Sequence, residues 1–275
     1  MKLSIITINL NNKDGLLKTV ESVVSQTFSD YEYIIIDGGS TDGSVDIIKQ
    51  YEDKVDYWIS EPDSGIYNAM NKAISQAKGE YCLFLNSGDW LFKKEGLEYV
   101  FNEMFVERDI VYYDVMTDQG EYRYPEKLTL LSFFISAPIG HQSSFIKTSL
   151  FSTIGLYNEN WKIVSDWEFF LKAVIEYRCT YKHYPYLLSH FNWEGISSTN
   201  AALSGKESNA VLRERYPMMY DDYIQLASMS NEIIHYRNSR IIQIVRKFQK
   251  SNVFEKIHAL FVKKEVNHTI HDIKN

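Results

Sequence analysis

Carboxylate and amide side chains follow several of the short apolar runs in the first ninety residues. Asn9 follows the run 3–8, Asp37 follows the run 33–36, and Asp89 comes shortly after the run 81–85. A carboxylate in such a place can accept hydrogen bonds from the edge of a nucleobase, or hold Mg²⁺ or Mn²⁺ through its oxygens. These residue types indicate a polar ligand site, although Asp37 could instead only stabilise a turn.

The spacing of apolar residues indicates which elements position these side chains. Buried strands are expected at 3–8, 33–36, 55–59 and 81–85, and the stretches between them have helical spacing, most clearly at 64–77. Such alternation is typical of βαβ units, whose parallel strands end at a common edge where ligands bind. The predicted fold class is therefore α/β, with a Rossmann-like, mostly parallel sheet that helices flank.

The second half of the chain has a less regular pattern. Strands are expected at 109–115, 142–146 and 181–188, and a helix at 166–177. His141 would begin the second of these strands, Asp166 would open the helix, and His190 would follow the last strand. From about residue 203 the pattern is helical. We therefore predict a catalytic domain over 1–200 and a helical carboxyl-terminal extension over 201–275.

Composition excludes several classes of protein. The 275 residues are 45% hydrophobic, and 36 Asp and Glu against 29 Lys and Arg give a formal net charge of −7, which argues against a general nucleic-acid binder. Two cysteines are too few for a disulfide framework and indicate free thiols. The chain shows neither a signal peptide nor an apolar run long enough to span a bilayer, so a cytoplasmic location is expected.

One stretch of the extension departs from this acidic balance. Residues 236–264 contain eight lysines and arginines against one glutamate, interleaved with apolar residues. Helices of this kind can lie on anionic membranes, so peripheral contact with the inner face of the cell membrane is one interpretation. A helical pair packed on the protein, or a homodimer contact, explains the same pattern.

Five segments occur in the order that one protein family shows. They lie within residues 4–27, 34–44, 63–72, 79–89 and 165–169, and their central motifs are Thr7-Ile8-Asn9, Asp37-Gly38-Gly39-Ser40, Asp63-Ser64-Gly65, Asn86-Ser87-Gly88-Asp89 and Ser165-Asp166-Trp167. Together they resemble family 2 glycosyltransferases over about residues 3–200. The resemblance implies a GT-A fold and transfer of a sugar from a nucleotide-sugar donor, with a UDP-sugar expected.

The resemblance also implies a nucleotide-sugar pocket. Asp37 matches the aspartate that contacts the base in the family, and Thr7 and Asn9 would line the same pocket. Asp63 would contact the nucleotide, and His141 would lie near the diphosphate. Roles in turns or helix caps are the structural alternatives for Thr7, Asn9 and Asp63.

A diphosphate leaving group calls for charge stabilisation, which Mg²⁺ or Mn²⁺ held by a carboxylate provides. The family commonly has an Asp-x-Asp-Asp motif at this strand end, but here Asn86 and Gly88 replace two of the aspartates. Asp89 is therefore the expected metal ligand, His190 is a further candidate ligand, and Gly88 would offer the donor only backbone contacts.

Asp166 matches the aspartate that the family uses as general base. Its carboxylate would take the proton from an acceptor hydroxyl that attacks the anomeric carbon opposite the diphosphate, and this single displacement inverts the configuration. The alternative is a first-turn carboxylate that stabilises the helix. Trp90, Trp167 and Trp193 are candidates to stack on sugar rings, although packing in the protein explains at least two of them better.

We therefore predict an inverting, metal-dependent glycosyltransferase that transfers a sugar to a lipid-linked or polysaccharide acceptor, as in the synthesis of capsule or lipopolysaccharide. The alternative is a degenerate, non-catalytic nucleotide-sugar-binding protein, which the loss of aspartates at Asn86 and Gly88 suggests. A nucleotidyltransferase would need a glycine-rich basic phosphate loop, and residues 9–15 do not supply one.

Overall fold

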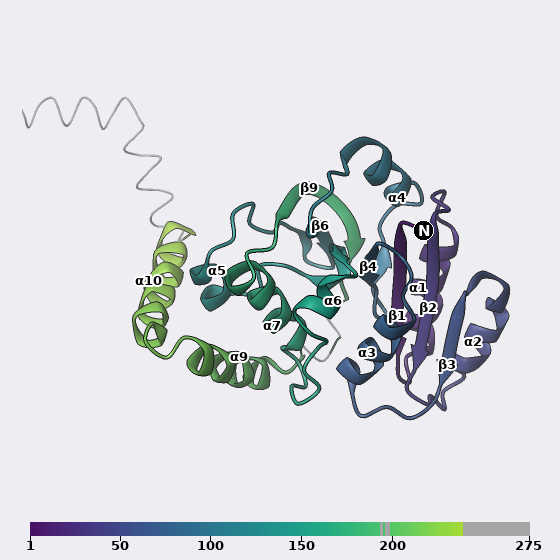
Figure 1. Ribbon diagram of the computed structural model, residues 1–275, viewed down its shortest axis with the longest axis horizontal. Coiled ribbons are helices and arrows are strands. Elements are labelled where there is room, and N and C mark those ends of the chain that lie inside the picture. Colours follow the sequence, from purple (N-terminus) through teal and green to yellow (C-terminus); the bar gives the residue numbers. More distant parts are fainter. Residues whose placement is uncertain (193–194, 196–198, 239–275) are drawn as a thin grey trace, which may run out of the picture. The chain divides into compact units, whose positions relative to one another are not determined.

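The computed structural model describes residues 1–192, 195 and 199–238 (Figure 1). The chain divides into two compact units, Met1–Tyr220 and Asp221–Asn275. The first unit contains the sheet and its helices. The described part of the second is the remainder of helix α10 (Tyr220–Asn238). The basic stretch predicted at 236–264 lies outside the described residues from 239 onward.

Four parallel strands form the first half of the sheet, in the order β3-β2-β1-β4. They are β1 (Leu3–Asn9), β2 (Tyr31–Asp37), β3 (Tyr57–Ser60) and β4 (Tyr81–Phe84). Every residue of β1 and β4 is buried, which is why these strands are continuous apolar runs rather than alternating ones. The predicted strands at 3–8, 33–36, 55–59 and 81–85 are confirmed with small changes of boundary.

Helices connect these strands and begin close to the edge where they end. Asn12 caps α1 (Lys13–Val24) by accepting a hydrogen bond from the Gly15 N–H, and α2 (Ser44–Gln50) and a short 3₁₀ helix (Glu52–Lys54) follow β2. Helix α3 (Ile66–Gln76) begins after Gly65, whose φ of +135° is a conformation that favours glycine. The start of α3 therefore lies beside the ends of β1 and β4.

The second half of the sheet mixes directions. Its order continues β4-β8-β6-β9-β5, with β8 antiparallel to β4 and to β6, and with β9 parallel to β6. The strands are β5 (Trp90–Leu91), β6 (Ile110–Thr117), β7 (Gly120–Tyr122), β8 (Ser144–Lys147) and β9 (Tyr181–His190). The helices are α4 (Gly96–Tyr99), α5 (Leu130–Ile135), α6 (Leu150–Thr153), α7 (Ser165–Leu171) and α9 (Ala201–Arg215).

Two predicted positions in this half were wrong. The helix expected at 166–177 is confirmed with small changes of boundary: it is α7, which begins at Ser165 and passes into a π-helical turn at Lys172–Glu176. His141 does not begin a strand, because His141–Ser143 form a 3₁₀ turn before β8. The Ser143 N–H and the Ser144 hydroxyl both donate to the Gly140 carbonyl oxygen and hold this turn closed. His190 is the last residue of β9 rather than a residue after it.

Side chains alternate between the two faces of the sheet and form two apolar clusters. Ile6, Ile34 and Phe84 pack on the face that α3, α6, α7 and α9 cover. Ile5 and Leu83 pack on the opposite face, against α1, α2 and α4. This period of two places the central strands β1 and β4 between two layers of helix and gives the edge of the sheet a rigid support.

Helix α9, which the sequence assigns to the extension, packs on the first unit. Val211 and Leu212 join the apolar cluster under α7, and Glu207 accepts hydrogen bonds from the backbone N–H groups of Lys162 and Ile163. The division after residue 200 stays a prediction. Both cysteines are free thiols, and none of the described helices is long and apolar enough to cross a membrane.

Candidate active site

Two adjoining cavities share part of their lining, and the first lies at the carboxyl edge of β1 and β4. The polar cavity has a volume of about 660 Å³ and includes residues of β1, α3 and the segment after β4, among them Asn9, Asp63 and Asp89. The aromatic cavity has a volume of about 390 Å³ and lies between β6, α5, α7 and α9. His141, Ile163, Asp166 and Phe191 line both cavities. The structure therefore places Asp166, the predicted base, where the two cavities meet.

The end of β1 is held by the carboxylate at the end of β2. Asp37 is fully buried and accepts hydrogen bonds from Asn9 Nδ2 at 2.7 Å, from Ser60 Oγ at 2.6 Å and from the Ser40 N–H at 2.9 Å. Burial has the largest effect and raises the pKa of Asp37, but the bonds from Ser40, Ser60 and Asn9 together lower that pKa below its ordinary value.

This network leaves one acceptor of Asn9 unused. Asn9 lines the polar cavity, and its Oδ1 is buried without a hydrogen-bond partner. Buried acceptors are nearly always paired, so this oxygen is suited to a donor on a bound ligand. Asp37 itself does not line the cavity; it acts on the pocket by holding Asn9.

Asp63 lines the polar cavity directly before α3. Its Oδ1 accepts a hydrogen bond from the Gly65 N–H at 2.9 Å. Its Oδ2 lies so near Gly38 that a Cβ there would come within 2.6 Å, so a glycine at 38 allows the close approach. A glycine in the motif after β2 thus positions the carboxylate that precedes α3.

Asp89 is 5% exposed, lines the polar cavity and accepts a hydrogen bond from the Asn192 N–H at 2.9 Å. Burial raises the pKa of Asp89 to about 6, and the Asn192 bond and the charge of His141 only partly oppose this. A buried carboxylate with so little compensation is a group that a cation would stabilise.

The residues around Asp89 supply a small set of ligands for a divalent cation. Within the described ranges no three His, Cys, Asp or Glu side chains come together as a metal site. Asn86 Oδ1, on the same cavity wall, is buried without a partner and is a second oxygen donor. Mg²⁺ commonly takes one or two protein oxygens and completes its shell with substrate phosphates and water, so these residues fit such a cation.

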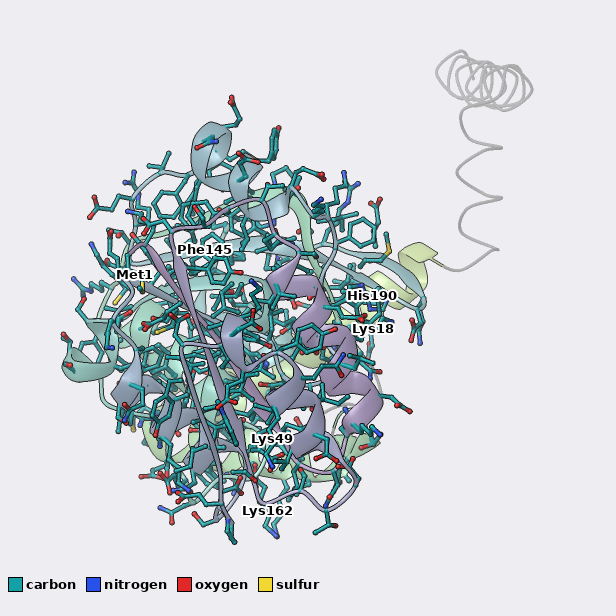
Figure 2. The ribbon with its side chains drawn as sticks, turned by 90° about the vertical axis from the view of Figure 1, so that its right-hand side faces the viewer. Met1, Lys18, Lys49, Phe145, Lys162 and His190 are labelled. Carbon is teal, nitrogen blue, oxygen red and sulfur yellow. The ribbon has the colours of Figure 1, made fainter. Side chains whose placement is uncertain are left out.

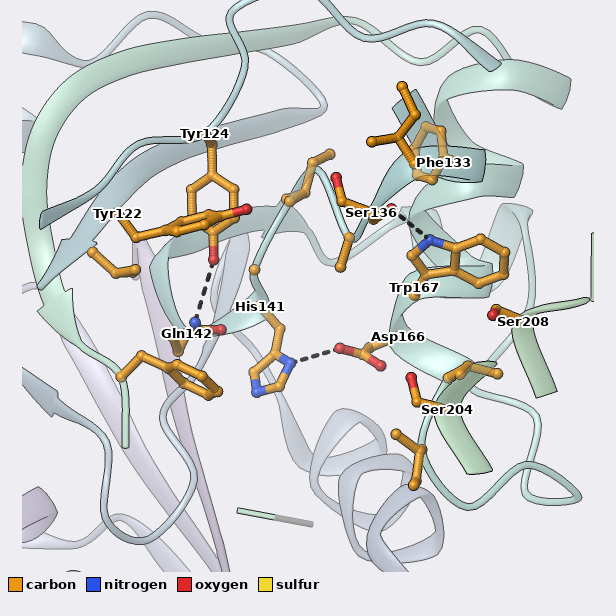
Figure 3. Close-up of a pocket in the computed structure, with 18 of the residues that line it drawn as sticks. Tyr122, Tyr124, Phe133, Ser136, His141, Gln142, Asp166, Trp167, Ser204 and Ser208 are labelled. Carbon is orange, nitrogen blue, oxygen red and sulfur yellow. Dashed lines mark hydrogen bonds and ion pairs between the residues drawn. The ribbon is translucent and has the colours of Figure 1, made fainter. Parts of the chain in front are cut away.

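Asp166 is the centre of a chain of hydrogen bonds that joins three parts of the fold. Its Oδ2 lies 2.8 Å from His141 Nδ1 (Figure 3). Its Oδ1 accepts a hydrogen bond from the Tyr67 hydroxyl at 2.7 Å. On the other side of the imidazole, His141 Nε2 lies 3.2 Å from Asn86 Nδ2. The chain Asn86–His141–Asp166–Tyr67 therefore runs from β4 to α3.

The charges in this chain reinforce each other. Burial has the largest effect on both groups: it raises the pKa of Asp166 and lowers the pKa of His141. The hydrogen bond and charge between the two outweigh burial, so the pKa of Asp166 lies below its ordinary value and that of His141 above it. Asp166 is thus an ionised carboxylate between the two cavities, available to accept a proton.

The aromatic cavity has a different character (Figure 3). Six aromatic side chains line it: Tyr122, Tyr124, Phe133, Phe134, Trp167 and Phe191. The Trp167 indole N–H donates to the Ser136 carbonyl oxygen at 3.3 Å, and Gln142 Nε2 donates to the Tyr124 hydroxyl at 3.4 Å. These contacts hold the walls in place, so the cavity is formed before any ligand enters.

Besides Asp37, three predicted site residues do not line either cavity. Thr7 is buried and its hydroxyl is 3.0 Å from that of Tyr33. The Gly88 N–H donates to Thr19, and its φ of +104° explains the glycine. The His190 ring stacks on Trp90 at 3.7 Å, with Nε2 3.4 Å from Asp118. In Figure 2, His190 lies beside Lys18, away from Lys162 of the polar cavity.

Sequence reasoning did not assign several residues that the structure brings to the site. Tyr67 and Asn86 complete the chain around His141 and Asp166, and Asn12 lines the polar cavity while its Nδ2 donates to the Ser87 carbonyl oxygen. Lys162 is the one lysine or arginine among the described residues of that cavity. Tyr67 lies in the helix expected at 64–77, but nothing in the sequence distinguishes Lys162. Trp193 lies outside the described residues.

Known proteins are similar to this chain in sequence. The model of the family "Glycosyl transferase family 2" matches residues 4–164. A PGL/p-HBAD biosynthesis glycosyltransferase from Mycobacterium bovis is 30% identical over 202 residues, which are 71% of this chain and 79% of that protein. The putative teichuronic acid biosynthesis glycosyltransferase TuaG from Bacillus subtilis is 39% identical over 143 residues, 49% of this chain and 52% of its own.

Solved structures show the same architecture. S. aureus TarS 1–349, in complex with UDP-GlcNAc, aligns with a TM-score of 0.64 at 20% sequence identity, over 88% of this chain and 74% of that one. This likeness confirms the GT-A fold that the sequence motifs imply. Because the family model covers more than half of the residues and a relative is similar over most of its own length, the chain belongs to glycosyl transferase family 2.

Proposed function

We propose that this protein is an inverting glycosyltransferase that moves a sugar from a UDP-sugar to a hydroxyl group of a glycan or lipid-linked acceptor. The single observation that carries the proposal is the position of Asp166, an ionised carboxylate that lines both a polar and an aromatic cavity. A transferase needs one basic group that both substrates can reach, and this residue meets that requirement.

The polar cavity is the proposed site of the donor. Its oxygen acceptors, Asn9 Oδ1 and the Asp63 carboxylate, suit the donor groups of a base and ribose, and Lys162 supplies a positive charge for phosphate. TarS, whose fold is similar, has been solved with UDP-GlcNAc bound. Asp89, with Asn86, would hold Mg²⁺ or Mn²⁺, which when bound supplies Lewis-acid stabilisation of the diphosphate.

In the proposed reaction the acceptor enters through the aromatic cavity. Asp166 takes the proton of its hydroxyl as the oxygen attacks the anomeric carbon from the side opposite the diphosphate, so the configuration inverts. His141 and Tyr67 keep the carboxylate ionised and fix its orientation by their hydrogen bonds. Asn86 fixes the imidazole from the other side.

Two further predictions concern partners. The names of the two relatives, which refer to PGL/p-HBAD and to teichuronic acid, support an acceptor in the synthesis of a cell-envelope glycan or glycolipid. Peripheral contact with the membrane and a homodimer contact through 236–264 are proposals from sequence alone.

The test measures release of nucleoside diphosphate from UDP-, GDP- and dTDP-sugars, with Mn²⁺, Mg²⁺ or EDTA and a panel of acceptor glycosides. Asp166→Asn should lower kcat by about 10²- to 10⁴-fold without weakening donor binding. Asp53→Asn, at an exposed aspartate, is the matched control. Donor binding without turnover by any form, with every acceptor, would support a non-catalytic binding protein instead.

A further inference from the structure

The aromatic cavity differs from the polar one in what it lacks as well as in what it contains. Among its described lining residues the side chains that carry charge are Asp166 and His141, with no lysine, arginine or glutamate. Four serine and threonine residues, Thr117, Ser136, Ser204 and Ser208, line it together with the six aromatic rings. We infer that this cavity binds an uncharged sugar ring of the acceptor and rejects rings that carry a carboxylate or phosphate. The inference rests on the proposed function.

The mixture of aromatic rings and hydroxyl groups favours a sugar over a purely apolar ligand. A pyranose presents C–H groups on its faces, which pack on aromatic rings, and hydroxyl groups at its rim, which need partners. The volume of about 390 Å³ is that of a small-molecule site. The hydroxyls of Thr117 and Ser208 already donate to the Gly120 and Gly205 carbonyl oxygens, and a hydrocarbon chain would offer no partner to those of Ser136 and Ser204.

The wall of this cavity is rigid where a ring would stack. Trp167 is held by its bond to the Ser136 carbonyl oxygen and by an edge contact with Phe133, at 6.2 Å between ring centroids. Tyr124 is anchored through its backbone N–H, which donates to Asp114 at 3.0 Å. A preformed wall of flat rings selects a ring-shaped ligand because little ordering is needed on binding.

Charge explains the rejection of anionic rings. An anion in this cavity would lose its hydration without meeting a free cation among the lining residues that the structure describes, which is costly. His141 cannot serve, because its Nδ1 bonds to Asp166 and its Nε2 faces Asn86. The ionised Asp166 would also repel a uronate or phosphate that approached the position of the reacting hydroxyl. Both effects act against charged acceptors and leave neutral ones unaffected.

The test follows the indole N–H signal of Trp167 by NMR in the full-length chain, with and without UDP and Mg²⁺. Trp167→Phe assigns the signal, and Trp58→Phe, at a tryptophan on β3, is the control that should leave it unchanged. Titrations use the methyl glycosides of glucose, galactose, mannose and N-acetylglucosamine, the matched methyl glucuronide and galacturonide, and phenol. At least one neutral glycoside should shift the signal saturably, at tenfold or more lower concentration than its uronate.

Several results would overturn the inference. A uronate that binds as well as its neutral counterpart, phenol that binds as well as the glycosides, or no shift with any neutral glycoside would each do so. Ser208→Lys adds a cation to the wall and should reduce the preference against the uronates, whereas an unchanged preference would contradict the role assigned to charge. Sugar transfer is measured separately from binding. Binding of a sugar ring without any sugar transfer would contradict the proposed function. Transfer to uronates as fast as to neutral rings would contradict only this inference.

Discussion

His141 Nδ1 lies 2.8 Å from Asp166 Oδ2, across 25 residues of sequence and between a 3₁₀ turn and the first turn of α7. The side chains are 15% and 19% exposed, so the pair is shielded from solvent yet lines both cavities. Because each group shifts the pKa of the other, a change at one should be measurable at the other. This coupling gives one prediction for the pKa of His141, and the contact of His141 with Asn86 gives a second prediction of opposite sign.

The first concerns Asp166→Asn, which removes the charge that raises the pKa of His141. Burial, which lowers that pKa, then acts alone, so we expect the pKa of His141 to fall below its ordinary value of 6.5. Proton–nitrogen NMR correlations of the imidazole measure it directly. Tyr67→Phe is the control, since it removes a bond to the other oxygen of Asp166. An unchanged pKa in Asp166→Asn would refute the coupling.

The same pair determines in which direction the stability of the protein changes with pH. The folded-state pKa of His141 lies above its unfolded value, so the stabilisation is fully present below about pH 6.5 and is lost as the pH rises through the folded pKa. The free energy of unfolding of the unsubstituted protein, relative to Asp166→Asn, should therefore decrease over that window.

The second prediction concerns Asn86→Asp, which restores the residue that the family commonly has. The Asn86 amide nitrogen lies 3.2 Å from His141 Nε2, so a proton on Nε2 would face another donor there. A carboxylate at this position would instead accept a hydrogen bond from a protonated Nε2, and the pKa of His141 should rise further. The same NMR titration checks this, and a fall would show that Asn86 does not contact the imidazole as described.

A third prediction concerns the cost of keeping Asp89 ionised. Its folded pKa of about 6 exceeds the ordinary value of 3.8, so the folded state loses stability as the pH rises from about 4 to 6. In EDTA at pH 7.5, Asp89→Asn should raise the free energy of unfolding by up to about 3 kcal/mol, and this gain should vanish near pH 4. Urea unfolding at both pH values measures it. A variant less stable at pH 7.5 would disprove this account of the burial.

The strand-end residues could be predicted because parallel strands share an edge. Asn9 ends β1, Asp63 and Asp89 follow β3 and β4 at that edge, and all three line the polar cavity. The spacing of apolar residues does not show in which direction a side chain at the end of a strand points. Asp37 also ends a strand, yet its oxygens turn back to Asn9, Ser40 and Ser60 because those donors surround it.

The aromatic cavity could not be predicted for a related reason. Its aromatic rings come from segments whose apolar residues have no common spacing, including the hairpin of β6 and β7, the short helix α5, and α7. The mixed strand directions of the sheet bring these segments together. The same mixing places His141 against Asp166. Local spacing reports which face of an element is apolar, but contacts between elements far apart in sequence depend on strand order.

A fourth prediction concerns helix α9 and the division of the chain. Glu207 is 7% exposed and accepts the N–H groups of Lys162 and Ile163, which directly precede α7. Glu207→Ala would leave two buried donors unpaired and should cost about 2–4 kcal/mol, with a smaller loss for Glu207→Gln, which keeps one acceptor. Urea unfolding measures both variants, and equal stability of the alanine variant would show that α9 does not brace α7.

The last prediction tests how tightly the aromatic wall is built. A Cβ at Gly140 would lie 2.1 Å from the Tyr124 hydroxyl oxygen, a distance that no pair of unbonded atoms tolerates, so Gly140→Ala must displace Tyr124. We expect a loss of about 1–3 kcal/mol.

The shortest contact would be with the Tyr124 hydroxyl, and the Oε1 and Nε2 atoms of Gln142 would lie 2.8 and 2.9 Å from the new Cβ. Tyr124→Phe removes the shortest of these contacts, so the double variant should recover part of that loss. The two single variants and the double variant form a cycle whose coupling energy, from urea unfolding, should exceed about 0.5 kcal/mol in the restoring direction. Simple additivity would mean that Tyr124 does not press on Gly140, and that the wall of the proposed acceptor site is looser than its contacts imply.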